Sequence, residues 1–180
     1  NPIKTSYSFL NDLSLGGLLP GLIITILGRP QNGKSYIVQQ LREDIMRDKK
    51  RDIATLLYNL EMPWFSLLLV QIKKRIGKSF KEILSISPTT EETKIMREIA
   101  DDFRDPRLTT ITTALTPSEW DYTTRLWIEQ NLDKEQLFVL YDHAGITKGT
   151  NKLEAIFELM ERANNIKLDY SNKVTFIILG

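Results

Sequence analysis

Short apolar, β-branched runs alternate with longer amphipathic segments along this 180-residue sequence. The apolar runs cover residues 22–27, 53–58, 108–112, 137–141 and 174–179. Alternation of such runs with helical segments of ten or more residues is typical of βαβ units around a parallel sheet. The sequence therefore predicts an α/β fold with a mostly parallel central sheet and helices on both faces. With no internal repeat or low-complexity tract, we expect residues 1–180 to form a single domain.

Helix starts are indicated by capping residues and by apolar periodicity. We expect helices over residues 34–47, 117–130 and 152–165, and a polar, helical stretch between Gly77 and Pro106. Thr89 with Glu92 and Thr116 with Glu119 have the spacing of capping boxes. A further helix after Pro63 turns Leu67, Leu68, Ile72 and Ile76 inward and Lys73, Lys74 and Arg75 outward. Trp120 and Trp127 lie two helical turns apart, which favours packing on a sheet over base stacking.

Composition excludes several classes of protein. The 24 basic and 23 acidic side chains give a net charge of +1, so a globally basic nucleic-acid binder is not indicated. The absence of Cys and the single His143 exclude disulfide scaffolds, thiolate zinc sites and His-rich metal sites. No apolar run approaches the roughly 20 residues of a membrane span. The first residues show no basic-then-apolar pattern, so we expect no signal peptide among them. We interpret the chain as an excised or truncated cytoplasmic domain.

The segment between the first apolar run and the first amphipathic helix has the pattern G-x-x-x-x-G-K-S. Such a loop cradles phosphates with its main-chain N–H groups and the helix N-terminus, while its Lys neutralises β/γ oxygens and its Ser ligates Mg²⁺. The pattern predicts a nucleotide and Mg²⁺ as ligands, with Lys34 also catalytic and Ser35 on the metal. The expected nucleotide contacts are Gly28, Arg29, Pro30, Gln31, Asn32, Gly33, Lys34, Ser35 and Tyr36.

Two carboxylates follow buried strands and are candidates for the chemistry. Asp142 ends the apolar run 137–141, where an unpaired charge would be costly, so we expect it to hold the metal as a Walker B carboxylate. Glu61 ends the second run at the same edge of a parallel sheet, where it can orient or deprotonate the attacking water. The alternatives are that Asp142 caps the following loop and that Glu61 caps the helix begun by Pro63.

Taken together, these segments resemble the ATPase domain of DnaB-type replicative DNA helicases, within the RecA-like P-loop class. The resemblance rests on Thr5–Leu13 and Leu15–Gly21 at the amino-terminal end, Arg29-Pro30 followed by Gly33-Lys34-Ser35, and Leu60-Glu61-Met62. It implies a motor that hydrolyses ATP to translocate on single-stranded DNA and unwind duplexes, with Glu61 as the catalytic carboxylate. His143 stands where the family usually has an aromatic residue after the Walker B Asp.

The resemblance also implies partners. The family forms hexameric rings, meets primase and helicase loaders through regions outside these residues, and completes its catalytic site with an arginine finger from a neighbouring subunit. Because the γ-phosphate sensor and the finger would follow Gly180, we expect this chain alone to turn ATP over poorly. The family's DNA loops correspond to residues 145–152, where Lys148 and Lys152 are candidate backbone contacts and ordinary solvated surface is the alternative.

Two other interpretations stay open. A RecA- or RadA-like ATPase shares the strand order and the phosphate loop but acts in filaments or under partner control. A helicase loader or an inactive paralogue would keep ATP binding without unwinding. Arg29-Pro30 and Leu60-Glu61-Met62 favour the helicase over the first, and the complete set of Lys34, Ser35, Glu61 and Asp142 argues against the second.

Overall fold

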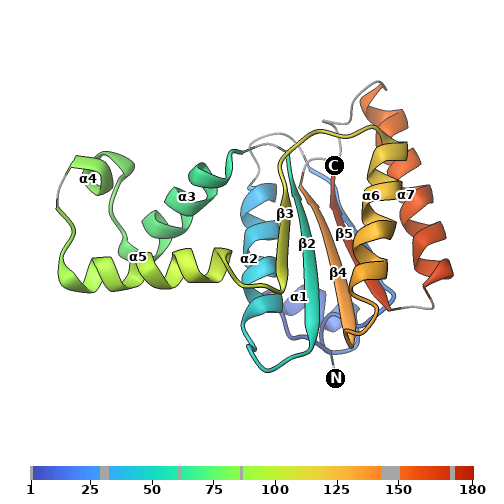
Figure 1. Cartoon of the computed structure of the whole chain (residues 1–180), viewed down its shortest axis with the longest axis horizontal. Coiled ribbons are helices and arrows are strands. Elements are labelled where there is room, and N and C mark those ends of the chain that lie inside the picture. Colours follow the sequence, from blue (N-terminus) through green and yellow to red (C-terminus); the bar gives the residue numbers. More distant parts are fainter. Residues whose placement is uncertain (1, 29–32, 61, 86, 143–150, 171–172) are drawn as a thin grey trace.

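The computed structural model describes residues 2–28, 33–60, 62–85, 87–142, 151–170 and 173–180. Within these residues five strands form one sheet in the order β1-β5-β4-β2-β3, and every neighbouring pair is parallel (Figure 1). The strands are β1 (Ile23–Ile26), β2 (Ile53–Asn59), β3 (Leu108–Ile111), β4 (Gln136–Asp142) and β5 (Val174–Leu179). This confirms the predicted α/β class and parallel sheet, because each strand lies within two residues of its expected bounds.

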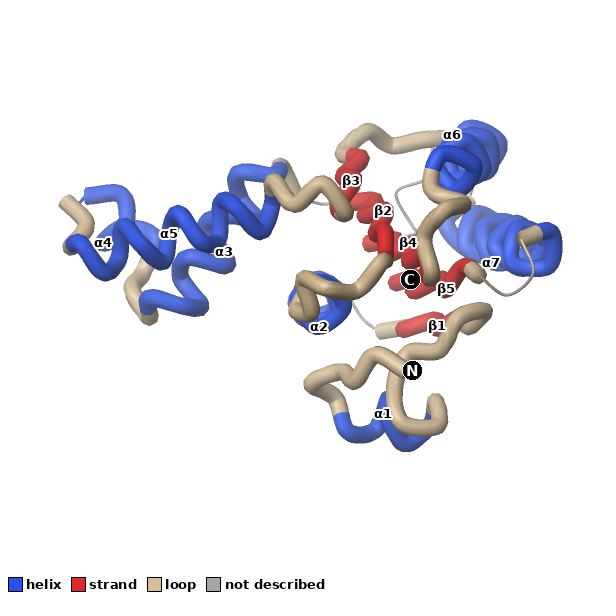
Figure 2. Tube along the Cα trace, turned by 60° about the horizontal axis from the view of Figure 1, so that its bottom comes forward, coloured by secondary structure: helices blue, strands red, loops and turns tan. Residues whose placement is uncertain are grey.

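Helices cover both faces of this sheet, as expected (Figure 2). α6 (Pro117–Gln130) and α7 (Lys152–Asp169) pack on the face to which β4 turns Leu137, Val139 and Tyr141. α1 (Ser8–Leu13) and α2 (Lys34–Met46) pack on the face to which β4 turns Phe138 and Leu140. All seven residues of β2 and of β4 are buried, because a parallel strand covered on both sides has no solvent-facing side chain.

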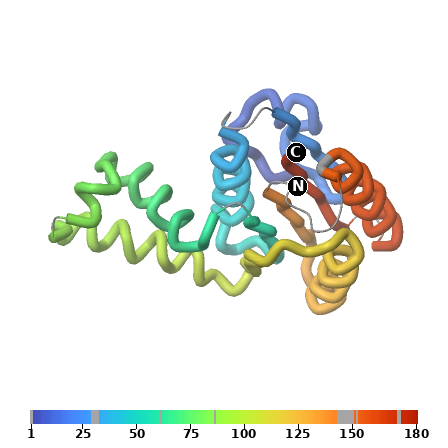
Figure 3. Tube along the Cα trace, turned by 90° about the horizontal axis from the view of Figure 1, so that it is seen from above, coloured from blue at the N-terminus to red at the C-terminus, as the bar shows by residue number. Residues whose placement is uncertain are grey.

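Three helices leave the sheet and form an arm, which we define as residues 64–103. α3 (Trp64–Ile76), α4 (Phe80–Ser85) and α5 (Thr90–Phe103) extend away from the strands in Figures 1 and 3, and α3 packs along α5. Leu67 and Ile72 are buried and Lys73 to Arg75 are exposed, as predicted. The apolar side of α3 nevertheless faces α5, whereas most amphipathic helices of this fold class cover the sheet.

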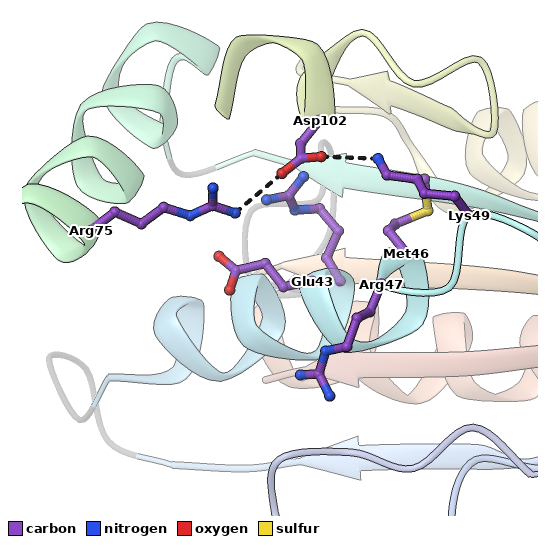
Figure 4. Close-up of a pocket in the computed structure, with 7 residues that line it drawn as sticks. Glu43, Met46, Arg47, Lys49, Arg75 and Asp102 are labelled. Carbon is purple, nitrogen blue, oxygen red and sulfur yellow. Dashed lines mark hydrogen bonds and ion pairs between the residues drawn. The ribbon is translucent and has the colours of Figure 1, made fainter. Parts of the chain in front are cut away.

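Charged and aromatic side chains join the base of the arm to α2. Asp102 of α5 accepts hydrogen bonds from Nζ of Lys49 at 2.9 Å and from Nη2 of Arg75 at 3.2 Å (Figure 4). The guanidinium carbon of the buried Arg42 lies 4.3 Å from the ring centroid of Phe103. Arg42, Lys49, Arg75 and Asp102 line a small cleft of about 240 Å³. Since the Asp102 carboxylate is already paired with two cations, we assign this cleft a structural role in holding the arm against α2.

Hydrogen bonds to Asp44 hold the amino-terminal segment against α2. The buried Asp44 accepts hydrogen bonds from the main-chain N–H and the hydroxyl of Ser6, at 2.6 and 2.7 Å. Ile3 and Leu18 form an isolated antiparallel bridge, and Gly17 sits against it with φ of 147°. A Cβ on Gly17 would lie 2.4 Å from the Ile3 carbonyl oxygen, so this close approach requires glycine.

Several local predictions are confirmed and a few boundaries move. Thr89 with Glu92 and Thr116 with Glu119 form complete capping boxes. Trp120 and Trp127 are buried in the core on the α6 and α7 face. α7 continues to Asp169, four residues past its predicted end, and the short α1 was not predicted. Among the described helices, none combines the length and the apolar character needed to cross a bilayer.

Candidate functional site

The carboxyl ends of β1, β4 and β2 meet at one edge of the sheet, because parallel strands all end on the same side. Gly28 follows β1, and Gly33 and Lys34 begin α2, so the described residues on either side of the glycine-rich loop lie at this edge. Gly33 is the N-cap of α2 and has φ of 73°, a left-handed conformation that favours glycine. Arg29, Pro30, Gln31 and Asn32 lie outside the described residues, so their predicted contacts stay predictions.

The side chain of Lys34 folds back to Gly28, the residue at the other end of the loop sequence. Its Nζ donates a hydrogen bond to the main-chain oxygen of Gly28, six residues earlier. A Cβ on Gly28 would lie 3.4 Å from Cδ of Lys34, so the Lys34 side chain packs along Gly28. The Lys34 ammonium and the main-chain N–H groups in the first turn of α2 both favour an anion at this position.

Ser35 and Asp142 meet although 107 positions separate them in the sequence. The Ser35 hydroxyl in the first turn of α2 donates a hydrogen bond to Oδ1 of Asp142 at 3.1 Å. Asp142 is the last residue of β4 and only 1% exposed. The two residues predicted to hold a metal therefore lie side by side, one supplied by α2 and one by β4, against which α2 packs.

The Ser35 hydroxyl and the Asp142 carboxylate offer oxygen ligands, which are the kind that Mg²⁺ takes. Among the described residues no three His, Cys, Asp or Glu side chains gather into a cluster that could hold an ion by themselves. Mg²⁺ takes oxygen ligands and commonly uses one or two protein groups together with phosphate oxygens and waters. One hydroxyl and one carboxylate beside a phosphate loop fit this pattern.

Asn59 is a site residue that the sequence reasoning missed. It ends β2 and is the direct partner of Asp142 in the β2–β4 register. Its Nδ2 donates a hydrogen bond to the main-chain oxygen of Met62. A polar residue at the end of an otherwise apolar buried strand was the signal that identified Asp142, and it applies equally to Asn59.

Tyr36 lies next to Ser35 and is half-exposed. The Nζ of Lys74, on α3, is 5.2 Å from the Tyr36 ring centroid, and Lys74 also pairs with Glu43 at 2.9 Å. The pKa of Tyr7 is raised. Burial is the main cause, and the nearby Tyr36 and the acidic groups on α2 add to it. The start of α2 is thus bordered by aromatic rings and by the arm. Nucleotide contact by Tyr36 stays a prediction.

The remaining predicted residues are not brought into the site by the described geometry. Glu61, His143 and Lys148 lie outside the described residues. Lys152 begins α7, and its side chain is not described. The structure therefore brings together Gly28, Gly33, Lys34, Ser35 and Asp142, while the roles of Glu61, Lys148 and Lys152 stay predictions.

Comparison of the sequence with protein-family profiles and with curated proteins finds no match. Solved structures do match. One, described as an ATPase domain, superposes with a TM-score of 0.72 at 14% sequence identity, over 99% of this chain and 64% of that one. A DnaB-like replicative helicase, described with its interactions with primase, gives a TM-score of 0.71 at 14% identity, over 99% of this chain and 44% of that one.

The chain thus spans less than two thirds of the length of either protein. At 14% identity the likeness concerns the fold, and it agrees with the resemblance inferred from the phosphate loop and the Leu60-Glu61-Met62 segment. The five parallel strands, the helices on both faces and these superpositions together show that the chain has the RecA-like fold of the ATPase domains of DnaB-type helicases.

Proposed function

We propose that this chain is the ATP-binding and ATP-hydrolysing motor core of a DnaB-like replicative DNA helicase, acting with Mg²⁺ in the cytoplasm. The observation that carries the proposal is the Ser35–Asp142 hydrogen bond at the start of α2. This bond brings a hydroxyl and a buried carboxylate together at the start of the helix that follows the glycine-rich sequence. The fold that carries them is shared with helicase ATPase domains.

Each residue has a distinct task in this proposal. The N-terminal N–H groups of α2 and the Lys34 ammonium bind the phosphates and offset the charge that develops during transfer of the terminal phosphoryl group to water. Ser35 and Asp142 hold Mg²⁺, which when bound neutralises phosphate oxygens. Glu61 orients the attacking water and accepts its proton. The chain's own groups thus supply positioning and electrostatic stabilisation.

The proposal extends to an assembly. Hydrolysis at interfaces between subunits of a hexameric ring would move the segment that contains Lys148 and Lys152 along single-stranded DNA. Primase is a proposed partner, because the DnaB-like neighbour is described with its interactions with primase. A helicase loader is proposed from the family resemblance alone. A ring would also explain a low rate for the isolated chain, since catalysis would need a group from the next subunit.

Nucleotide binding by wild type, Lys34→Ala and Lys50→Ala tests the central step. Removal of the Lys34 ammonium should weaken Mg²⁺-ATP binding at least tenfold, because a charge-assisted contact contributes about 1.5–3 kcal/mol. Lys50 is an exposed lysine after α2 and serves as the control. Equal binding by wild type and Lys34→Ala would contradict the proposal.

DNA dependence separates the helicase from its alternatives. The test uses a protein that continues past Gly180, so that the neighbouring subunit can supply the group that this chain alone would need. The ATPase rate of the wild type should rise when single-stranded DNA is added, and the rate of Glu61→Ala should stay at background while nucleotide binding is retained. ATP binding that DNA does not affect would instead favour a loader or another regulatory ATPase.

A further inference from the structure

Asn59 presents an unsatisfied acceptor beside the proposed magnesium site. It ends a strand whose seven residues are all buried, and it is itself 1% exposed. One end of its amide is used, because Nδ2 donates to the main-chain oxygen of Met62. The other end, Oδ1, is buried and has no hydrogen-bond partner among the described residues. Buried polar atoms rarely stay without a partner, so this oxygen calls for a ligand or a water.

The register places Asn59 on the correct face for such a ligand. Asn59 and Asp142 are direct partners in neighbouring parallel strands, so their side chains leave the sheet on the same side. Alternation along both strands identifies that side, because Leu57 and Leu140 both pack in the cluster around α2. Ser35, in the first turn of α2, contacts Asp142 on this face. The Asn59 amide therefore lies beside the Ser35–Asp142 pair.

The proposed ion supplies the missing donor. Mg²⁺ releases its waters reluctantly and usually keeps several of them when it is bound by protein groups and phosphates. A metal-bound water is a strong donor and needs an acceptor, which in metal sites is commonly a carbonyl or a carboxylate just outside the ligands. Asn59 Oδ1 is an amide carbonyl oxygen with its accepting capacity unused.

We propose that Asn59 is a positioning residue of the magnesium site, whose Oδ1 accepts a hydrogen bond from a water molecule bound to the ion held by Ser35 and Asp142. This inference rests on the proposed function. The other end of the same amide donates to the main-chain oxygen of Met62. This bond orients the Asn59 side chain and so leaves Oδ1 as the end available to the proposed water.

The chain offers a matched control in Gln136. Gln136 is another buried amide of the β2–β4 pair, it is 3% exposed, and its Nε2 has no hydrogen-bond partner among the described residues. It lies at the opposite end of the pair, opposite Ile53. Asn59→Leu and Gln136→Leu therefore make the same chemical change at the two ends of one strand pair, and only the first is made beside Asp142.

The test measures metal binding apart from turnover. Electron paramagnetic resonance follows Mn²⁺, as a substitute for Mg²⁺, in the complex with a non-hydrolysable ATP analogue, and thermal unfolding is recorded for every variant. Asn59→Leu should raise the Mn²⁺ dissociation constant about tenfold, as loss of a hydrogen-bond partner of a metal ligand does in other metal sites. Gln136→Leu should leave it unchanged. Asn59→Asp keeps the acceptor oxygen and should retain wild-type affinity or exceed it.

Different results contradict different statements. Wild-type Mn²⁺ affinity in Asn59→Leu, or an equal loss in Gln136→Leu, would show that Asn59 is only structural and would overturn this inference. Failure of the wild-type protein to bind Mn²⁺ with the nucleotide would instead contradict the proposed function. Should Asn59→Leu fail to fold, Asn59→Ala takes its place with the same expectation, because its side chain has no acceptor oxygen.

Discussion

The Ser35 hydroxyl donates a hydrogen bond to Oδ1 of Asp142 at 3.1 Å and so joins the first turn of α2 to the end of β4. If both groups hold one ion, Ser35→Ala and Asp142→Asn should each weaken Mg²⁺-dependent nucleotide binding about tenfold or more. The double variant should lose less than the sum of the two single losses, because the pair acts together. Nucleotide titrations at fixed Mg²⁺ measure all three.

Asp133→Asn is the matched control for this cycle, because Asp133 is an exposed carboxylate that pairs with the neighbouring Lys134, away from the site. Its nucleotide binding should equal that of wild type. Strictly additive losses in Ser35→Ala and Asp142→Asn would indicate that the two residues do not share an ion.

Gly17→Ala should destabilise the amino-terminal segment by about 2 kcal/mol or more, because an added Cβ would collide with the Ile3 carbonyl oxygen at a strained φ of 147°. Gly77→Ala provides a comparison that isolates the backbone strain. Gly77 has φ of 76°, but nothing lies within 4 Å of the added Cβ, so a loss of about 1 kcal/mol is expected. Urea unfolding of both variants gives the difference, and equal losses would argue against a collision at Gly17.

Tyr58 should make the protein less stable in alkali. Burial raises the pKa of Tyr58 above its ordinary value of 10.0, and the hydroxyl forms a 2.8 Å hydrogen bond with Thr124. Above pH 10 the unfolded chain loses this proton while the folded chain keeps it, so the free energy of unfolding falls as pH rises. Tyr58→Phe should reduce this alkaline fall and cost about 1 kcal/mol at neutral pH.

Unfolding curves between pH 7 and pH 11 make this comparison, with Tyr122→Phe as the control, since Tyr122 is 70% exposed. An alkaline fall of the same size in wild type and Tyr58→Phe would exclude Tyr58 as its source.

Asp105 should contribute to the fall in the free energy of unfolding at acid pH. Hydrogen bonds from the Arg107 side chain, and further bonds from the Arg107 N–H and from Lys49, lower the pKa of Asp105 below its ordinary value of 3.8. The depressed pKa stabilises the folded state above about pH 4, and this contribution is lost as pH falls toward the folded-state pKa. The stability difference between wild type and Asp105→Asn should therefore be greatest near pH 7 and shrink below pH 4. Asp101→Asn, at an exposed carboxylate, should show no such trend.

Most of the sheet could be predicted from the sequence because each strand is covered on both faces. Runs such as Leu137–Tyr141 are then apolar throughout, and Asp142 stands out as the charge that ends one. The same argument applies to Asn59, yet an amide draws less attention than an ionised group. Its alignment with Asp142 depends on the register of the two strands, and its oxygen is without a hydrogen-bond partner only in the folded arrangement of the described residues. The local sequence contains neither property.

The sequence predicts that the arm is helical, but it does not predict that these helices extend away from the sheet. Amphipathic periodicity shows that Leu67 and Ile72 share a face, and it does not show whether a sheet or another helix covers that face. The difference is made by contacts between distant segments, such as Asp102 with Lys49. α1 was missed because six residues are too few to display a helical period.

The arm also has a consequence for the order in which this chain folds. β2 and β3 are neighbours in the sheet, yet residues 60–107 separate them, and pairing distant strands requires a large loop to close first. α3 and α5 contact each other over a much shorter stretch of chain. Pairing of helices that are near each other in the sequence is fast. Once α3 and α5 have paired, the two ends of the arm lie close together, and so do β2 and β3, which are attached to those ends. The arm is thus expected to form early and to lower the entropy that closing the sheet at this edge would otherwise cost.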